Sequence, residues 1–283
     1  MARRKIATKR VRPINYFKHA FFYSNYLKGK NIIIVGPSNI LEGSKQGEKI
    51  DNYDIVVRLN NTFPINPLHE DYSLIHEDIG NRTDVLYHTG AIMRSLKWAA
   101  NRYNTGRIKL LDRDKIKWIV AKRDPVYGNE KEKRALNRFV LLNRKYVIAQ
   151  KTKGITLNTV FNFFVNDLRI KLDGTEPNMS TIAIMHLLEF NIKSLRILGC
   201  DFYSGEYHKS YFIPDYLEWD NLNKILIRKD GQKRKTPKVP HDYKKQIKFL
   251  LNVFENDKRV IIDNQIIDLW KEKLQELWLK LVA

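Results

Sequence analysis

Six short runs of apolar, mostly β-branched residues recur along the 283-residue chain, and longer stretches that suit helices separate them. Such alternation favours an α/β domain with a mostly parallel sheet. The runs are apolar almost throughout, not at every second position, which suits strands covered on both faces. We therefore predict a Rossmann-like, mostly parallel sheet flanked by helices, with strands at residues 31–35, 54–58, 84–87, 116–120, 195–198 and 259–262.

Two helices are predicted from caps and periodicity. Residues 178–190 follow Pro177 and offer Asn178 or Ser180 as the N-cap. Residues 264–283 carry an apolar stripe that includes Trp270. This last helix either docks on the domain or lies at a membrane interface. Its nearly balanced charges favour docking.

The formal net charge is +20, and it is unevenly distributed. Residues 1–30 hold nine Lys or Arg and no acidic residue, and residues 228–248 hold nine against two acids. A field of this sign attracts nucleic acid, anionic membranes or acidic small substrates. We predict a basic N-terminal tail over residues 1–30, a single domain over residues 31–283, and a mobile basic loop at about residues 228–248.

The N-terminal segment and the apolar runs do not suggest a targeting signal or a membrane span. No stretch approaches the roughly 18 apolar residues that span a bilayer. The aromatic segment near the N-terminus is interrupted by Lys18 and His19 and lacks a small-residue cleavage site, so we expect neither a signal peptide nor a transmembrane segment. Cys200 is the only cysteine, which suits a reducing compartment. We therefore predict a cytoplasmic protein that associates peripherally with an anionic membrane through its basic tail.

A polar turn at Gly36 follows the first predicted strand. Such a turn presents N–H groups at the carboxyl edge of a sheet, where α/β proteins bind ligands and anions. The three-glycine dinucleotide fingerprint and the Walker loop are both absent, which disfavours a nicotinamide enzyme. Asp112-Arg113-Asp114 resembles an acidic metal-binding pair, but its central arginine argues against a cation site. No zinc spacing exists either, and we expect no metal.

Two of the seven histidines, His208 and His241, lie in polar, aromatic surroundings. Histidine titrates near neutral pH, so a positioned imidazole can take a proton from a hydroxyl group. A surface or structural role is the alternative for either one. His241 lies inside the basic segment, where a closing lid would carry chemistry.

Several segments resemble the sialylmotifs of the family 29 sialyltransferases. Residues 35–60, VGPSNILEGSKQGEKIDNYDIVVRLN, resemble the large motif, which reads V-G-N-S-G-N-L and then G-x-x-I-D-x-x-D-x-V-x-R-x-N; DIGNRTD at 78–84 resembles its continuation, D-V-G-x-K-T. Residues 177–202 resemble the small motif. Tyr207-His208 falls where the third motif is expected, and His241 where the very small motif, H-x(4)-E, has its histidine. The order and spacing fit across residues 31–250.

The chain departs from these motifs at five places. Pro37 replaces the asparagine that contacts the donor nucleotide, Ser180 replaces the small-motif glycine, and Gln246 replaces the final glutamate. The two cysteines whose disulfide links the motifs in animal members are absent, with Asn31 or Ile32 and Phe190 near their places. This loss suits a cytoplasmic bacterial or viral relative.

The resemblance implies a variant GT-A-like fold and transfer of sialic acid from CMP-sialic acid to a sugar hydroxyl, with inversion and without a metal or cofactor. His241 would be the general base, and His208 with Tyr207 would stabilise the departing phosphate. Ser180 and Thr181 would bind the sugar carboxylate. The nucleotide and its phosphate would contact Gly36, Pro37, Ser38, Asn39 and Asn60. Structural roles are the alternatives: a turn for Gly36, an ion pair for Arg58 and an N-cap for Ser180.

Three other functions are left open by these residues. A transferase of Kdo or a related acid from its CMP donor would need the same contacts. A nucleic-acid-binding protein would explain the charge, but no known nucleic-acid-binding module is recognisable, so we do not expect this partner. A degenerate transferase that binds donor without turnover is compatible with Pro37 and Gln246. The expected partners are a CMP-sugar donor and a glycan, glycolipid or lipopolysaccharide-like acceptor.

Overall fold

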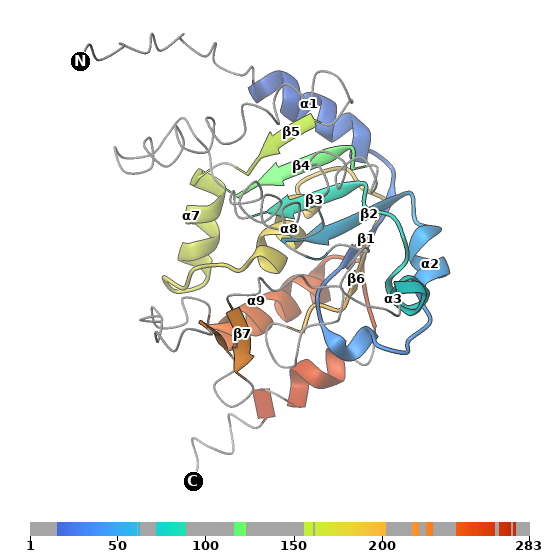
Figure 1. Cartoon of the computed structure of the whole chain (residues 1–283). Coiled ribbons are helices and arrows are strands. Elements are labelled where there is room, and N and C mark those ends of the chain that lie inside the picture. Colours follow the sequence, from blue (N-terminus) through green and yellow to red (C-terminus); the bar gives the residue numbers. More distant parts are fainter. Residues whose placement is uncertain are drawn as a thin grey trace, which may run out of the picture.

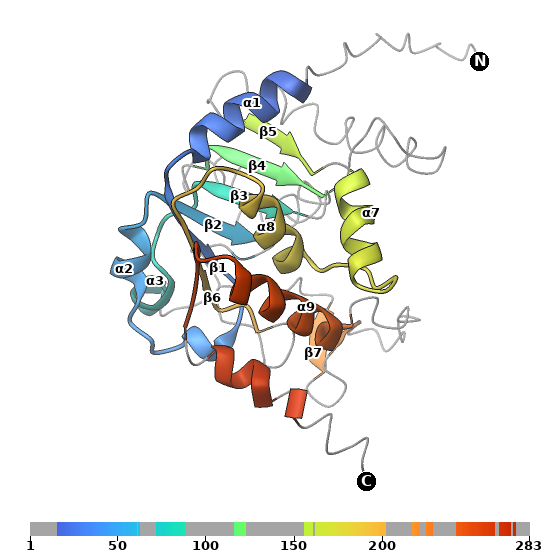
Figure 2. The same cartoon turned by 180° about the vertical axis from the view of Figure 1, so that it is seen from behind.

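The computed structural model describes residues 16–60, 62, 72–88, 116–122, 156–160, 162–201, 217–220, 225–228, 242–263, 266–272 and 274–275. Helices and strands alternate along these residues, as Figures 1 and 2 show. The helices are α1 (Tyr16–Leu27), the 3-10 turn η1 (Asn39–Leu41), α2 (Gly47–Asp51), α3 (Tyr72–Ile79), α7 (Asn162–Lys171), α8 (Met179–Leu188) and α9 (Tyr243–Asn256). The strands are β1 (Asn31–Val35), β2 (Ile55–Leu59), β3 (Val85–His88), β4 (Trp118–Ala121), β5 (Thr156–Thr159), β6 (Ser194–Leu198), β7 (Leu217–Asp220), β8 (Ile225–Arg228) and β9 (Val260–Ile262).

Seven strands form one sheet in the order β5-β4-β3-β2-β1-β6-β9, and every neighbouring pair is parallel. All six predicted strands belong to this sheet, and β5 is added at one edge. Strands β1 to β5 follow one another outwards from β1, whereas β6 and β9 lie on its other side. The α/β class and the mostly parallel sheet are therefore confirmed. β7 and β8 pair separately and antiparallel, which the sequence did not predict.

Helices cover the sheet on both faces, so the domain has three layers. One face packs against α1, α7, α8 and α9, and its core includes Tyr23, Ile182 and Leu250. The other face packs against η1, α2 and α3 through Leu41, Ile50 and Ile79. In Figure 2, α8 and α9 lie in front of the sheet, and α2 and α3 lie at its side. Two-sided cover explains why the strands are apolar almost throughout.

The first helix corrects the predicted boundary between tail and domain. Residues 16–27 form α1, so the prediction of a tail through residue 30 was wrong. Tyr23 and Leu27 are fully buried in the core, and the Tyr23 ring lies 5.0 Å from that of Trp118. The charges of this segment suggested a tail, but one apolar stripe is enough to dock a helix.

The predicted mobile loop is also corrected. Residues 243–248 begin α9, so the prediction was wrong for them, and residues 229–241 lie outside the described ranges. Oδ1 of Asp242 accepts hydrogen bonds from the N–H groups of Lys244 and Lys245, at 3.0 and 3.2 Å, and so caps the helix. Ile247 and Leu250 are buried, whereas Lys245 and Lys248 are exposed.

The C-terminal helix docks on the domain, as predicted. Residues 266–272 and 274–275 are helical. Trp270 is fully buried and stacks on Phe254 with ring centroids 6.0 Å apart. Its indole N–H donates to the carbonyl oxygen of Cys200 at 3.2 Å, which anchors the helix beside the end of β6. None of the helices in the described ranges is both long and apolar enough to cross a bilayer.

Candidate active site

The strand order reverses between β1 and β6, two neighbouring parallel strands. In open α/β sheets, ligands bind beyond the carboxyl ends of the strands at such a reversal. The segments that follow β1 and β6 are residues 36–39 and 199–201, and the predicted donor-binding turn is one of them. The fold therefore places that turn where this class of sheet binds ligands.

Gly36 allows the two segments to approach each other. A methyl group on Gly36 would lie 2.2 Å from the carbonyl oxygen of Gly199 and 2.8 Å from the sulfur of Cys200. The N–H of Gly36 donates to Leu198 at 2.8 Å, and the N–H of Ser38 donates to Gly199 at 3.1 Å. The glycine is thus required by packing, whatever ligand the turn holds.

Ser38 connects the turn to an acidic side chain that the sequence interpretation missed. Its hydroxyl donates to Oδ2 of Asp201 at 3.0 Å, and both side chains are buried. Ser38 also caps η1, because its oxygen accepts the N–H of Ile40 at 3.3 Å. Pro37 and Asn39 flank it and are half-buried. The sequence does contain a signal for Asp201, because this acidic residue lies three positions after the end of the predicted strand at 195–198.

The amino end of α8 carries the two residues predicted for the sugar carboxylate. Of the two predicted candidates, Asn178 is the N-cap and accepts the N–H of Thr181 at 2.8 Å, whereas Ser180 lies inside the helix. The Thr181 hydroxyl donates to Oε1 of Gln246 at 2.7 Å, so both donors of Thr181 are used inside the fold. Ser180 instead hydrogen-bonds Cys200, next to the Gly36 turn. Burial, the largest effect, raises the pKa of the Cys200 thiol to about 12.

Asn60 lies directly after β2 with a φ of 51°, in the left-handed region. Asparagine tolerates this conformation better than most residues, and such backbone strain is common at binding sites. Its N–H donates to the carbonyl oxygen of Tyr87 at 2.7 Å, which fixes it beside the end of β3. The structure thus holds Asn60 at the same edge of the sheet as the Gly36 turn.

Arg58 has a structural role. It is fully buried, and it donates to the carbonyl oxygen of Ile79 at 2.6 Å, to that of Arg82 at 3.0 Å and to the hydroxyl of Thr83 at 3.1 Å. These acceptors belong to the connection between α3 and β3. Of the two readings of Arg58, the structural one is supported, although its partners are carbonyl and hydroxyl oxygens and not Asp51 or Asp54.

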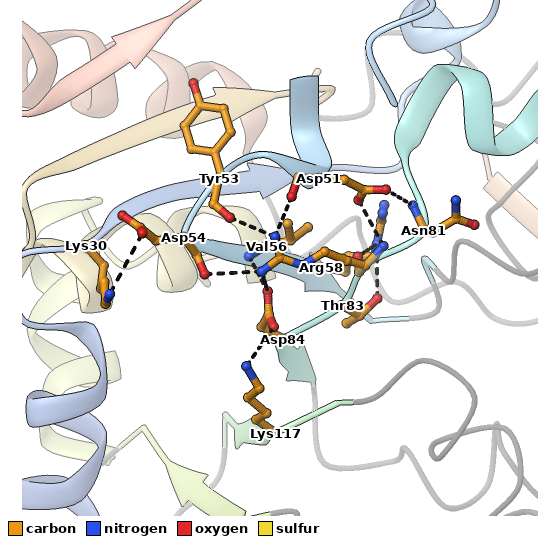
Figure 3. A network of polar contacts seen from close by, with 11 residues as sticks. Lys30, Asp51, Tyr53, Asp54, Val56, Arg58, Asn81, Thr83, Asp84 and Lys117 are labelled. Atoms are coloured by element: carbon orange, nitrogen blue, oxygen red, sulfur yellow. Dashed lines mark hydrogen bonds and ion pairs between the residues drawn. The ribbon is translucent and has the colours of Figure 1, made fainter. Parts of the chain in front are cut away.

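A polar network surrounds Arg58 (Figure 3). Asp51 accepts the N–H groups of Asn81 and Arg82 at 2.8 and 3.0 Å. Asp84 is almost fully buried, accepts the N–H of Val56 at 2.9 Å, and pairs with Arg82 at 2.8 Å and with Lys117 at 3.4 Å. The acidic residues of the motif-like segment therefore fix the loops between strands.

The two segments in which the resemblance leads us to expect a disulfide-forming pair of cysteines lie side by side here. The N–H of Gly29 donates to the carbonyl oxygen of Asn191 at 2.8 Å, and the Ser194 hydroxyl donates to Oδ1 of Asn31 at 2.8 Å. Parallel pairing of β1 with β6 continues the contact. Hydrogen bonds and strand pairing thus hold together what a disulfide would covalently link.

Two buried histidines were not singled out from the sequence. Nδ1 of His186 on α8 bonds the hydroxyl of Tyr87 at 2.8 Å, and this hydroxyl lies 3.2 Å from that of Tyr23. Burial lowers the pKa of His186 to about 4 and that of His88, the last residue of β3, to about 3. Both rings are therefore neutral at physiological pH.

The predicted catalytic residues Tyr207, His208 and His241 lie outside the described residues, and so does the Asp112-Arg113-Asp114 tripeptide. Their roles stay predictions. Within the ranges that are described, no three His, Cys, Asp or Glu side chains gather as a metal site would require.

The sequence profile of glycosyltransferase family 29 (sialyltransferase) matches residues 24–175, which is more than half of the chain. The chain belongs to glycosyltransferase family 29. The family 29 match begins inside α1, in agreement with the corrected domain boundary. It covers the Gly36 turn, Arg58 and Asn60, and it ends just before the segment that resembles the small motif. A family 29 member is a glycosyltransferase, so the chain is an enzyme of the sialyltransferase type.

Two crystal structures are similar to this family 29 chain in fold. Both are of a mammalian sialyltransferase, one of them in complex with Gal-β-1-3GalNAc-ortho-nitrophenol. Each shares 12% sequence identity over 90% of this chain and 81% of the other, with TM-scores of 0.42 and 0.43. Values this low carry no argument about activity. A comparison with curated protein sequences gives no match.

Proposed function

We propose that the enzyme transfers sialic acid from CMP-sialic acid to a hydroxyl group of a glycan, glycolipid or lipopolysaccharide-like acceptor, with inversion and without a metal. The observation that carries this proposal is the family match over a sheet whose order reverses at the Gly36 turn. The donor has a phosphate and a carboxylate, and the net charge of +20 is matched to such a substrate.

The donor would lie along the carboxyl edge of the sheet. The turn of Gly36, Pro37, Ser38 and Asn39 would receive the nucleotide and its phosphate, with Asn60 from the neighbouring strand. The sugar carboxylate would be bound at the amino end of α8, which favours negative charge. Ser180 and Thr181 are the candidates for this contact; both donors of Thr181 are used inside the fold and the Ser180 hydroxyl bonds Cys200, so a bound carboxylate would have to take over one of these bonds.

The chemistry would be a direct displacement. The acceptor hydroxyl attacks the anomeric carbon, a new C–O bond forms there, and the bond to the phosphate oxygen of CMP breaks. His241 takes the hydroxyl proton as general base. His208 and Tyr207 stabilise the negative charge on the departing CMP. Inversion follows because a single displacement occurs from the opposite face.

The test is a transfer assay with CMP-sialic acid, CMP-Kdo and a panel of galactoside and lipooligosaccharide acceptors, followed by CMP release and product mass. We expect turnover with CMP-sialic acid that survives EDTA and gives an inverted linkage by NMR. His241→Ala should lower the rate by about 100-fold or more while CMP binding persists, because only the proton transfer is lost.

Other outcomes of this assay would contradict the proposal. Turnover of CMP-Kdo alone would identify the other acid sugar. CMP release that stops with EDTA would contradict the metal-independent mechanism. CMP binding without turnover on any acceptor would favour a degenerate transferase.

We further propose that the acceptor lies on an anionic membrane. Nine basic and no acidic residues occur within residues 1–30, and the rings of Phe21 and Phe22 on α1 are 62% and 49% exposed. Sedimentation with phosphatidylserine vesicles should remove the enzyme from solution, less so at high salt and in the Phe21→Ser variant. Equal binding to neutral vesicles, or none, would contradict this association.

A further inference from the structure

Two buried polar side chains at the carboxyl edge of the sheet are left unsatisfied. His88 is 2% exposed and Thr62 is fully buried. Within the described part of the chain, the two ring nitrogens of His88 and the hydroxyl oxygen of Thr62 have no hydrogen-bond partner. Buried polar groups in native proteins are almost always hydrogen-bonded, so each exception requires an explanation.

Both residues are held by the backbone at neighbouring strand ends. His88 ends β3, and its carbonyl oxygen accepts the N–H of Lys122 at 2.9 Å. Thr62 follows β2, and its N–H donates to Leu59 at 3.0 Å. Leu59 pairs with Tyr87, the residue before His88. The two unsatisfied side chains thus belong to adjacent strand ends, close in sequence or register to Asn60.

His88 lies on the opposite face of β3 from Tyr87, because successive side chains of a strand alternate. The Tyr87 hydroxyl is engaged with His186 in the core, so His88 is not part of that cluster. β3 lies two strands from β1, or about 10 Å at the usual spacing. A sugar nucleotide that contacts the Gly36 turn is longer than this separation between the strands.

The chemistry of the two groups restricts what they bind. Burial lowers the pKa of His88 to about 3, so the ring is neutral and offers one donor and one acceptor. The Thr62 hydroxyl also donates and accepts. Neither group supplies positive charge, and a phosphate or carboxylate would gain little from them. Paired donors and acceptors suit hydroxyl groups, which have the same dual character.

We propose that His88 and Thr62 form a neutral subsite that hydrogen-bonds a vicinal diol of the sugar nucleotide. The diol belongs either to the ribose of the nucleotide or to the polyhydroxyl chain of the acid sugar. The proposal rests on the proposed function and extends it, because it assigns the contacts that recognise the uncharged part of the donor.

The experiment measures binding and stability together. Thr62→Val and His88→Phe remove the polar atoms with little change in shape, and Thr62→Ser keeps the hydroxyl. Tyr26→Phe is the matched control, since the Tyr26 hydroxyl is also buried without a partner among the described residues but lies near Trp118, at the amino end of β4. Each protein is titrated with CMP, 2′,3′-dideoxy-CMP and CMP-sialic acid, and its Tm is measured without ligand.

We expect Thr62→Val and His88→Phe to weaken CMP-sialic acid binding about tenfold or more, while the Tm of the free protein is unchanged or higher. A loss for CMP that vanishes with dideoxy-CMP assigns the ribose. A loss for CMP-sialic acid alone assigns the sugar chain. Thr62→Ser should retain affinity, and Tyr26→Phe should leave every Kd unchanged.

Several results would overturn the subsite. One is a Kd for CMP-sialic acid within twofold of the wild-type value in both Thr62→Val and His88→Phe. Another is an equal loss for CMP and dideoxy-CMP, because the diol would then be irrelevant. A lower Tm in Thr62→Val with unchanged Kd would assign a packing role to Thr62. If His88→Phe does not fold, the result for Thr62→Val alone decides whether the subsite exists. If the wild-type protein binds CMP-sialic acid and the variants bind it equally well, the subsite fails but the proposed function does not. If the wild-type protein does not bind CMP-sialic acid, both fail.

Discussion

Individual motif residues divide into two groups by what they contact. Arg58, Asp51 and Asp84 bond backbone groups of neighbouring loops and hold the strands in register. Gly36, Ser38 and Asn60 lie at the carboxyl edge. Gly36 is closely packed against Gly199, Ser38 caps η1, and Asn60 has a left-handed backbone conformation. Asn60 therefore lies at the edge of the candidate site, whereas Arg58 supports the connection between α3 and β3.

Replacing Arg58 tests this division. Arg58→Lys should lower the free energy of unfolding by about 3 kcal/mol, because an ammonium group cannot reach the three acceptors that the planar guanidinium reaches. CMP affinity should persist at temperatures where the variant is folded. The measurement is urea denaturation together with CMP titration.

Arg169→Lys is the matched control for Arg58→Lys, since Arg169 pairs with Glu176 near the surface. This substitution should lower the free energy of unfolding by about 1 kcal/mol or less. A folded Arg58→Lys protein that has lost CMP binding would instead place Arg58 in the donor site.

At the scale of elements, α8 and α9 are joined where their first turns meet. Oε1 of Gln246 on α9 accepts the N–H of Asn178 at 2.8 Å and the hydroxyl of Thr181 at 2.7 Å, and Gln246 is fully buried. Gln246 stands where the very small motif has glutamate. Since it serves as an acceptor inside the fold, its replacement of glutamate gives no reason to expect an inactive enzyme.

Gln246→Leu should destabilise the protein by about 1–3 kcal/mol, because it leaves two buried donors without their acceptor. Gln246→Glu should keep turnover at neutral pH and lose less stability than Gln246→Leu, since a carboxylate accepts the same two bonds but is a buried charge and lacks the amide donor that faces the carbonyl oxygen of Asp242. Thermal denaturation and CMP release check both variants. If Gln246→Leu retained full stability but lost turnover, a direct role in chemistry would replace this structural one.

The contact between α8 and β3 predicts a pH dependence of stability. Burial lowers the pKa of His186 from 6.5 to about 4. Between these values the unfolded chain binds a proton that the folded chain does not, so stability falls as the pH drops from 6.5 towards 4. The slope from one such group reaches about 1.4 kcal/mol per pH unit. His88, with a pKa of about 3, acts in the same direction.

Urea denaturation of the wild type and His186→Phe at pH 7 and pH 5 checks this dependence. The loss of stability between the two pH values should be smaller in the variant, because its ring cannot bind a proton. An identical loss in both proteins would show that other groups dominate. Phenylalanine suits this site because the rings of Tyr23, Phe164 and Phe190 surround it.

Elements that bury apolar surface on both faces were predictable, and elements with mixed character were not. Strands such as β1 and β2 are recognisable in the sequence as continuous apolar runs. β5 reads Thr-Leu-Asn-Thr and lies at the sheet edge, so its pairing depends on β4 and not on its own composition. α1 carries lysine and histidine among aromatic residues, and only its contact with the sheet shows that Tyr23 and Leu27 are core residues.

In the whole molecule, the sequence predicted which residues share one edge of the sheet better than which of their polar atoms are already bonded. Parallel strands bring Gly36 and Asn60 to one edge, and this follows from the order of elements alone. That the donors of Thr181 are occupied, and that His88 and Thr62 are unsatisfied, depends on side chains distant in sequence. Such pairings arise from packing, which no local pattern records.

The central claim is that this edge recognises a cytidine nucleotide as a transferase donor. Calorimetric titration with CMP, UDP, GDP and NAD, for the wild type and His241→Ala, tests it most directly. We expect selective CMP binding that is retained in His241→Ala while transfer from CMP-sialic acid is lost. Equal or absent binding of all four nucleotides would contradict it, and a steep salt dependence of duplex DNA binding would then favour the nucleic-acid alternative.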